Sequence, residues 1–290
     1  MRPRFRAGCG ENDPPNFSRE SRAGPGAGVR AIRRLPPGSA SSRSWLICAP
    51  VPALSNSDFE TIQNLDTCTV SNAIERLKVR LRNEGVVCGG ALHCQFPDFK
   101  PMLGYAATGR MRCTSAPVYG RAYHENMNWW RYVASIPEPR IMEVQDVDEK
   151  PGAGALVGEL HALIGLAIHC IGYVTNGSVR DLPAVEALGF HLFSKSVAVS
   201  HMYAHISEYG EPVEIGGLKI RPGDLIHGDR HGVHLIPLSI ASKIPAMAAE
   251  IRREEREIRE FCLSPNFSLR GLDKKLQHLP GDGIELPLTG

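Results

Sequence analysis

The 290-residue sequence lacks features that define several common classes of protein. Its eight cysteines contain no CxxC pair, so the ligand spacing of a zinc finger is missing. No apolar run approaches the roughly 18 residues that a membrane-spanning helix needs, and the longest run near the start, residues 45–54, contains two prolines. These absences argue against a zinc-finger protein and against a transmembrane helix.

Lysine is absent from the first 50 residues, which hold nine arginines and only three acidic residues. This segment carries a formal charge of about +6, so the rest of the chain sums to about −4 although the total is +2. The chain after residue 50 therefore lacks the dense basic surface with which proteins bind the phosphates of nucleic acids. We therefore expect neither nucleic acid nor membrane as a partner.

Residues 1–55 are rich in Arg, Gly, Pro and Ser and poor in periodic apolar residues, a composition that predicts a disordered leader. The leader could be an organelle transit peptide or an extension of the start, and both interpretations stay open. The cysteines are dispersed and no secretory signal precedes them, which favours reduced, buried thiols over disulfides. We expect a reducing, cytoplasmic location.

The first periodic patterns predict two short helices, at residues 58–65 and 69–77, and a strand at 104–113. A βαβα unit follows. Its parts are a strand at 140–147, a glycine-rich loop at 151–158, a helix at 159–169, a strand at 171–175, a turn at Asn176-Gly177 and a short helix at 183–188. Within the long helix, Gly165 would permit close packing on a sheet.

The second half of the chain is predicted to be mostly β-structure, with short strands bounded by Gly, Pro or Asp. The expected strands are 191–199, 212–215, 218–220, 225–228 and 233–236. One helix at 239–262 closes the domain, with its run of Arg and Glu on a surface that faces solvent or a partner. The tail at 263–290 is turn-rich and carries no motif.

The glycine loop and the helix that starts at Glu159 should form an anion site, because a helix N-terminus presents free N–H groups and a partial positive charge. The loop also approximates a dinucleotide fingerprint. However, the interval between its last two glycines is one residue longer than in the GxGxxG motif, and no acidic residue stands at the tip of the next strand. A nucleotide cofactor is therefore disfavoured, and a methyltransferase that uses the loop remains an alternative.

Arg180 and Asp181 follow the next strand, at the sheet edge where ligands of α/β proteins bind. Arginine offers a planar fork for a carboxylate or an enolate oxygen, and aspartate offers a hard oxygen ligand for a divalent ion. By itself such a pair is often a surface salt bridge. Glu159 adds a second carboxylate, twenty intervening residues before Arg180, although an acid at a helix start is also favoured by the dipole.

The run of residues 171–185 together with Glu159 resembles the RraA-like family, which includes the 4-hydroxy-4-methyl-2-oxoglutarate aldolases. Residues 212–218 and 221–233 resemble the closing β segments of the same family, and the resemblance covers roughly residues 57–262. It implies an α/β fold: a three-layer β/β/α swivelling-type domain with an N-terminal helical segment and a long C-terminal helix. The RraA-like catalytic domain would then span residues 56–262.

The resemblance also implies the chemistry of the site. Asp181 would bind Mg²⁺ or Mn²⁺, and Glu159, which replaces the aspartate of the aldolases, would reach the ion through water. The N–H groups from Gly158 to Leu160 would hold the substrate carboxylate. Arg180 would stabilise the enolate of pyruvate. The implied enzyme is a class II, metal-dependent pyruvate aldolase, a carbon-carbon lyase that cleaves a 4-hydroxy-2-oxo diacid and also decarboxylates oxaloacetate.

The same resemblance implies a homotrimer or a dimer of trimers with sites between subunits. Glu254 or Glu255 from a neighbour's closing helix would add to the surroundings of the metal. Some relatives are instead non-catalytic regulators that bind an RNA-processing enzyme, and that is the alternative function. Retention of Arg180 and Asp181 favours an enzyme that acts on a small 2-oxo acid.

Three further groups of residues could carry chemistry. The spacing of His201, His205 and Glu208 would suit zinc on one helical face, but the segment lies between predicted strands, which favours ordinary polar histidines. The pair His227 and His231 would belong to a turn between strands or to the mouth of the site. A third pair, Trp129 and Trp130, would pack in the core or at a subunit contact, or would form a lid.

Overall fold

The computed structural model describes residues 54–87, 90–118 and 127–277. The chain divides into two units, Met1–Ile47 and Cys48–Gly290, and every described residue belongs to the second unit. The predicted leader at 1–55 therefore lies outside the described residues except for its last two positions. The final thirteen residues of the predicted tail lie outside them as well.

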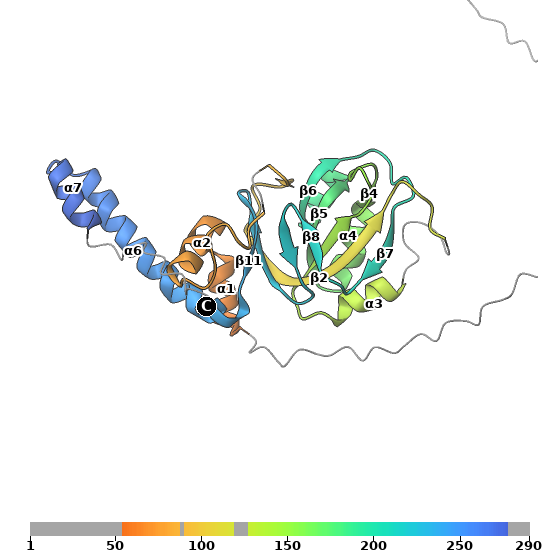
Figure 1. Cartoon of the computed structure of the whole chain (residues 1–290), viewed down its shortest axis with the longest axis horizontal. Helices are drawn as coiled ribbons and strands as arrows, with labels where there is room; N and C mark the ends of the chain where they lie inside the picture. The colour runs from red at the N-terminus through yellow and green to blue at the C-terminus, as the bar shows by residue number, and fades with distance from the viewer. Residues whose placement is uncertain (1–53, 88–89, 119–126, 278–290) are drawn as a thin grey trace, which may run out of the picture. The chain divides into compact units, whose positions relative to one another are not determined.

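A nine-stranded sheet with the order β1-β6-β5-β3-β2-β10-β11 organises this unit, with β4 paired to β5 and β7 paired to β2. The strands of the sheet are β1 (His93–Cys94), β2 (Met102–Arg112), β3 (Arg140–Asp146), β4 (Ala155–Val157), β5 (Cys170–Val179), β6 (His191–Val197), β7 (His205–Tyr209), β10 (Leu225–Asp229) and β11 (Gly232–Ile236). Strands β2, β3, β5 and β6 are parallel neighbours. The long strand β2, yellow in Figure 1, pairs with β10 along its first half and with β7 along its second, so the sheet curls toward closure.

Two layers cover the sheet. On one face, a core of Met111, Tyr173 and Leu192 packs against α3 (Met127–Ser135), α4 (Glu159–Ala167) and α5 (Leu182–Ala187). On the other face, Ile141 and Phe193 pack against the separate hairpin of β8 (Val213–Ile215) and β9 (Leu218–Ile220). Because successive side chains of a strand point to opposite faces, each central strand supplies both cores, and β3 is buried along almost its whole length. This is the predicted three-layer β/β/α arrangement.

A third core joins the N-terminal helices to the end of the chain. Helices α1 (Asn56–Gln63) and α2 (Thr67–Arg76) pack with the 3-10 helix η1 (Leu238–Lys243) and with α6 (Ile244–Cys262) around Ile62, Ile74 and Ile244. Helix α7 (Leu269–Leu276) follows α6, with the Ser268 hydroxyl accepting a hydrogen bond from the Gly271 N–H as its N-cap. The N-terminal helical segment and the long C-terminal helix are confirmed.

The predicted turn at Asn176-Gly177 is wrong, because β5 continues through both residues to Val179. The Asn176 side chain replaces a strand partner: its Oδ1 accepts from the Asp146 N–H at 2.7 Å, and its Nδ2 donates to the Asp146 carbonyl at 3.0 Å. A Cβ on Gly177 would overlap Met111, so the glycine provides space rather than a reversal. The strand consequently ends at Val179, so Arg180 and Asp181 follow it directly.

Three other boundaries differ from the prediction. The glycine loop at 151–158 contains the short strand β4. The expected single helix at 239–262 starts as the 3-10 helix η1, and α6 takes over at Ile244 with Pro245 in its first turn. Residues 205–209, for which no strand was predicted, form the strand β7. No helix in the described part of the chain is both long enough and apolar enough to cross a bilayer.

Candidate functional site

The glycine loop and the Arg180-Asp181 loop lie side by side, because β4 pairs in parallel with the end of β5. The register pairs Ala155 with Ser178 and Val157 with Val179, and the Arg180 N–H donates to the Val157 carbonyl at 3.1 Å. The predicted neighbourhood of the two loops is therefore present, and it is held by main-chain hydrogen bonds.

Asp181 contacts the start of α4 directly. Its Oδ2 accepts a hydrogen bond from the Glu159 N–H at 3.2 Å, while Gly158, the N-cap residue, offers no side chain for that purpose. A Cβ on Gly158 would overlap Asp181 Oδ2 and would lie 3.0 Å from the Arg180 Cγ. Only glycine therefore lets the carboxylate reach the free N–H groups of this helix.

The backbone of Asp181 is unusual as well. Its φ of 55° lies in the left-handed region, and its carbonyl accepts the first hydrogen bonds of α5, from Ala184 and Val185. The Arg180 Nε lies 3.1 Å from Asp181 Oδ1, and the two side chains are 30% and 36% exposed. An ion pair so open to water adds little to stability, but both groups are within reach of a small molecule.

The residues fit a hard divalent cation. Magnesium needs one or two carboxylates and keeps several waters, and Asp181 and the exposed Glu159 stand at adjacent positions of the two loops. The two recorded contacts of the Asp181 carboxylate leave lone pairs on both oxygens. Leu160, the other predicted contributor of an N–H group, is exposed in the first turn of α4.

The candidates on α6 differ from each other. Glu254 forms an ion pair with Arg76 of α2 at 3.0 Å, so within this chain its carboxylate has a partner. Glu255 is exposed, as are Arg252, Arg253, Arg256 and Glu257, which agrees with a charged surface on this helix. The role of Glu255 in a neighbouring subunit's site concerns an assembly and stays a prediction.

The histidine candidate at 201–208 does not have the geometry of a helical zinc site. His205 and Glu208 belong to β7, where a separation of three residues places side chains on opposite faces. Glu208 pairs with Arg110 at 2.6 Å, and the His201 Nδ1 lies 2.6 Å from the Ala155 carbonyl. The zinc alternative is therefore wrong, and the structure agrees with the favoured interpretation of ordinary polar histidines.

His227 does not line the mouth of a site. It is fully buried in β10, and its Nδ1 lies 3.0 Å from Nε2 of His234 on β11. Burial lowers the pKa of His227 to about 4. His231 lies in the turn between the two strands, as the alternative interpretation predicted, and its Nδ1 is 3.0 Å from Asp229 Oδ1.

Trp129 and Trp130 pack in the core, so the lid interpretation is wrong. Both are buried on α3, and the Trp130 ring lies 5.5 Å from the ring of His161 on α4. A Cβ on Gly109 of β2 would lie 2.9 Å from Trp129, which shows how closely that ring covers the sheet. The two tryptophans fix α3 against the helical face.

The described cysteines are free thiols, as expected, but not all are buried. Cys68 and Cys262 are exposed, whereas Cys113 and Cys170 are buried, and burial raises the pKa of each of these two thiols to about 12. Neither buried thiol is a nucleophile at neutral pH. Cys9, Cys48 and Cys88 lie outside the described residues.

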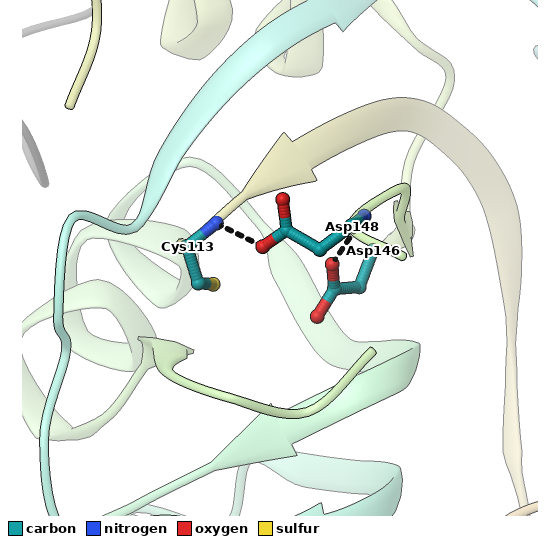
Figure 2. A group of neighbouring side chains, drawn as sticks. All are labelled: Cys113, Asp146 and Asp148. Carbon is teal, nitrogen blue, oxygen red and sulfur yellow. Dashed lines mark hydrogen bonds between the residues drawn. The ribbon is translucent and has the colours of Figure 1, made fainter. Parts of the chain in front are cut away.

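The sequence analysis missed one cluster of metal-ligand side chains. Cys113, Asp146 and Asp148 are all buried, and they offer three ligand atoms that lie within 4.8 Å of one another. Figure 2 shows the thiol and the two carboxyl groups turned toward a common space. The available signal was their position just after β2 and at the end of β3, two parallel neighbours whose carboxyl ends meet at one edge.

Fold and candidate site together define an α/β protein in which one edge of the sheet presents an arginine, two carboxylates and a helix N-terminus. The chain belongs to the RraA-like family, described as Aldolase/RraA, whose family model matches residues 67–235. A protein of Halalkalibacterium halodurans described as "Putative 4-hydroxy-4-methyl-2-oxoglutarate aldolase" is 30% identical over 149 residues, which cover 51% of this chain and 69% of that relative. An uncharacterised protein of Methanocaldococcus jannaschii is 34% identical over 130 residues, or 44% of this chain and 62% of the relative.

Two solved structures share the fold. An uncharacterised protein from Pseudomonas syringae aligns with a TM-score of 0.60 at 21% identity and covers 81% of this chain and 99% of its own. Streptomyces coelicolor RraAS2, described as an unusual member of the RNase ES inhibitor RraA protein family, aligns with a TM-score of 0.54 at 19% identity, covering 71% and 96%. Both support the predicted fold class.

Proposed function

We propose that this protein is a divalent-metal-dependent lyase that cleaves a 4-hydroxy-2-oxo diacid of the 4-hydroxy-4-methyl-2-oxoglutarate type and releases pyruvate. The same site would decarboxylate oxaloacetate. The observation that carries the proposal is the meeting of Glu159, Arg180 and Asp181 across the β4–β5 pairing, with Glu159 N–H at 3.2 Å and Arg180 Nε at 3.1 Å from the two oxygens of Asp181.

Asp181 and Glu159 are the residues that would hold Mg²⁺ or Mn²⁺, with Glu159 acting through water. A bound ion of this kind supplies Lewis acidity to the 2-oxo group and carboxylate of the substrate. Asp181 is suited to this task because its left-handed backbone and its contact with the Glu159 N–H fix the carboxylate before any ligand arrives.

Arg180 would bind the oxygen of the 2-oxo group. In the cleavage, the 4-hydroxyl loses its proton, the C3–C4 bond breaks, C4 becomes a carbonyl, and the electron pair forms an enolate on the pyruvate half. The guanidinium would stabilise the charge that develops on the enolate oxygen, and a proton from solvent at C3 completes pyruvate. We assign removal of the hydroxyl proton to Glu159, through a water molecule.

The substrate's carboxylate would lie at the start of α4, where the helix presents free N–H groups. The Glu159 N–H already donates to Asp181, so the proposal relies on its neighbours from Gly158 to Leu160 in the same turn. The exposure of Leu160 and Glu159 leaves this turn open to solvent. We further propose a homotrimer or a dimer of trimers, in which Glu255 of a neighbour reaches the surroundings of the metal.

The test is pyruvate release by the purified full-length chain after chelation, coupled to lactate dehydrogenase. We expect turnover of 4-hydroxy-4-methyl-2-oxoglutarate or oxaloacetate only when Mg²⁺ or Mn²⁺ is restored. Arg180→Ala should lower kcat by about 100- to 1000-fold, the usual cost of one oxyanion donor. Arg131→Ala, which removes an exposed arginine of α3, is the matched control and should retain full activity.

No metal-dependent pyruvate from either substrate class would reject the lyase. The alternative, a non-catalytic regulator that binds an RNA-processing enzyme, predicts that binding to its partner is indifferent to Arg180→Ala. Stabilisation of the chain by S-adenosylmethionine in a thermal melt would instead favour a methyltransferase.

A further inference from the structure

Cys113, Asp146 and Asp148 form a closed group at the carboxyl ends of β2 and β3 (Figure 2). Their residues are 0%, 1% and 6% exposed, so the three ligand atoms face one another inside the protein. The group is separate from the Arg180-Asp181 pair, both of whose side chains are about one-third exposed.

Main-chain N–H groups orient both carboxylates. Asp148 Oδ2 accepts from Cys113 N at 2.6 Å and from Thr114 N at 2.9 Å. The two oxygens of Asp146 accept from Asp148 N at 3.0 Å and from Gly152 N at 2.8 Å. A carboxylate offers about four lone-pair sites, so these four bonds use about half of the pair's capacity and hold the rest in fixed directions.

Two cations among the described residues, Arg112 and Lys195, act on the carboxylates of the cluster through their charge. The recorded ion pair is long: Arg112 Nη1 lies 3.9 Å from Asp148 Oδ1, and that guanidinium is half exposed. Two buried carboxylates beside a thiol therefore make a negative site that a cation would stabilise.

A fourth donor atom adjoins the sulfur. The Cys113 thiol donates to the Gly154 carbonyl at 3.4 Å, so the sulfur, two carboxylates and one carbonyl converge from β2, β3 and the glycine loop. A thiolate with carboxylate oxygens suits a borderline ion such as Zn²⁺, which takes four ligands at about 2.0–2.3 Å. Magnesium and calcium prefer oxygen-only sites.

We propose that Cys113, Asp146 and Asp148 bind one Zn²⁺-class divalent cation, with the Gly154 carbonyl as the fourth ligand. On binding, the S–H bond breaks, its proton passes to solvent, and a metal–sulfur bond forms. Four protein ligands leave no open position, so the site is structural. It ties the ends of β2 and β3 to the loop that leads into β4, and it does not depend on the proposed lyase activity.

Cobalt is the probe, because a thiolate–Co²⁺ bond gives a near-ultraviolet charge-transfer band that oxygen ligands do not. The full-length chain, chelated and then kept reduced by a phosphine, is titrated with Co²⁺. We expect the band to saturate at one equivalent, to disappear when one equivalent of Zn²⁺ is added, and to persist in excess Mg²⁺. Zn²⁺ should also raise the Tm of the wild-type chain.

Matched variants locate the ion. Cys113→Ser should lose the band and the Zn²⁺-induced rise in Tm, and Asp146→Asn should weaken Co²⁺ binding at least tenfold. Cys262→Ser, at an exposed cysteine, and Asp181→Asn, at the proposed magnesium site, should keep both signals.

Absence of a thiolate band from the wild-type chain at one equivalent of Co²⁺ would overturn the proposal, and this readout needs no variant to fold. A band of equal intensity in Cys113→Ser would overturn it too, because another cysteine would then hold the ion. In either case the cluster would only hold the glycine loop in place by hydrogen bonds.

Discussion

The N–H of Glu159 lies 3.2 Å from Oδ2 of Asp181, although 22 positions separate the two residues in the chain. The contact joins the start of α4 to the start of α5, because Asp181 is also the residue from which α5 begins. One residue thus serves two helix ends, α4 through its carboxylate and α5 through its carbonyl, and the carboxylate also faces the guanidinium of Arg180. Its position is fixed by secondary structure on both sides.

Gly158→Ala should damage the site more than the fold. The added methyl group would overlap Asp181 Oδ2, so the carboxylate must move away from the Glu159 N–H. A displacement of about 1 Å at a reacting group can cost about 100-fold, and we expect a loss of that order in kcat/KM for pyruvate release. Ala153→Ser, at an exposed position of the same loop, should leave kcat/KM unchanged. Equal kinetics for both variants would contradict the packing argument.

Glu159→Asp restores the residue that the resemblance associates with aldolases, and Glu159→Gln removes the charge. If the carboxylate takes a proton through water, the aspartate variant should keep kcat within about tenfold, whereas the glutamine variant should lose about 100-fold or more. Steady-state kinetics at saturating Mg²⁺ separate the two. Wild-type turnover by the glutamine variant would exclude a role for this carboxylate in the chemistry.

Asp229→Ala should destabilise the attachment of α2 to the sheet. Asp229 accepts hydrogen bonds from Thr67 N at 2.8 Å, from Thr67 Oγ1 at 2.7 Å and from His231 N at 2.8 Å. Loss of the carboxylate leaves a buried N–H without its partner, at a cost of about 1–3 kcal/mol in the free energy of unfolding. Asp98→Ala removes an almost fully exposed partner of Arg230 and should cost less than about 1 kcal/mol. Urea denaturation measures both, and equal costs would contradict the prediction.

The buried pair His227 and His234 should make the protein sensitive to mild acid. Burial lowers the pKa of His227 from 6.5 to about 4, and burial together with the charge of His227 lowers the pKa of His234 well below its ordinary value. Just below pH 6.5, the unfolded chain therefore binds protons at these two histidines that the folded chain does not bind. The stability that depends on neutral histidines is complete above pH 6.5 and is lost as the pH falls from 6.5 toward 4.

Each such proton contributes a slope of about 1.4 kcal/mol per pH unit. Between pH 6.5 and 4.5, the slope of the unfolding free energy against pH should decrease in His227→Gln by the contribution of about one proton. The slope should not change in His93→Gln, at an exposed histidine. An unchanged slope in His227→Gln would show that this side chain does not titrate differently in the two states.

The parts of the fold that follow from local pattern were predictable. The apolar residues of α4 recur every three or four positions, and most strands after Gly189 are bounded by turn residues, so these elements were predicted to within a few residues; β7 was missed. The neighbourhood of Glu159, Arg180 and Asp181 was predictable too, because a βαβ connection is short and its loops meet at one sheet edge.

Other features depend on contacts between distant residues. Asn-Gly usually marks a turn, but Asn176 bonds to the main chain of Asp146 and Gly177 lies against Met111, and these contacts keep β5 extended. The Cys113 cluster forms only because β2 pairs with β3, and α3 separates these two strands in the sequence. The buried state of His227 likewise depends on contact with a distant segment, the main chain near Leu65, and no local spacing encodes that.

The pairing of β4 with β5 has a consequence for how a ligand enters. Because the Arg180 N–H donates to the Val157 carbonyl, the loops that carry Glu159 and Asp181 cannot separate without breaking a main-chain ladder. The proposed substrate site is thus preorganised, and little ordering entropy would remain to be lost on binding of a substrate. A substrate would reach such a surface from the solvent side, without any hinge between these two loops.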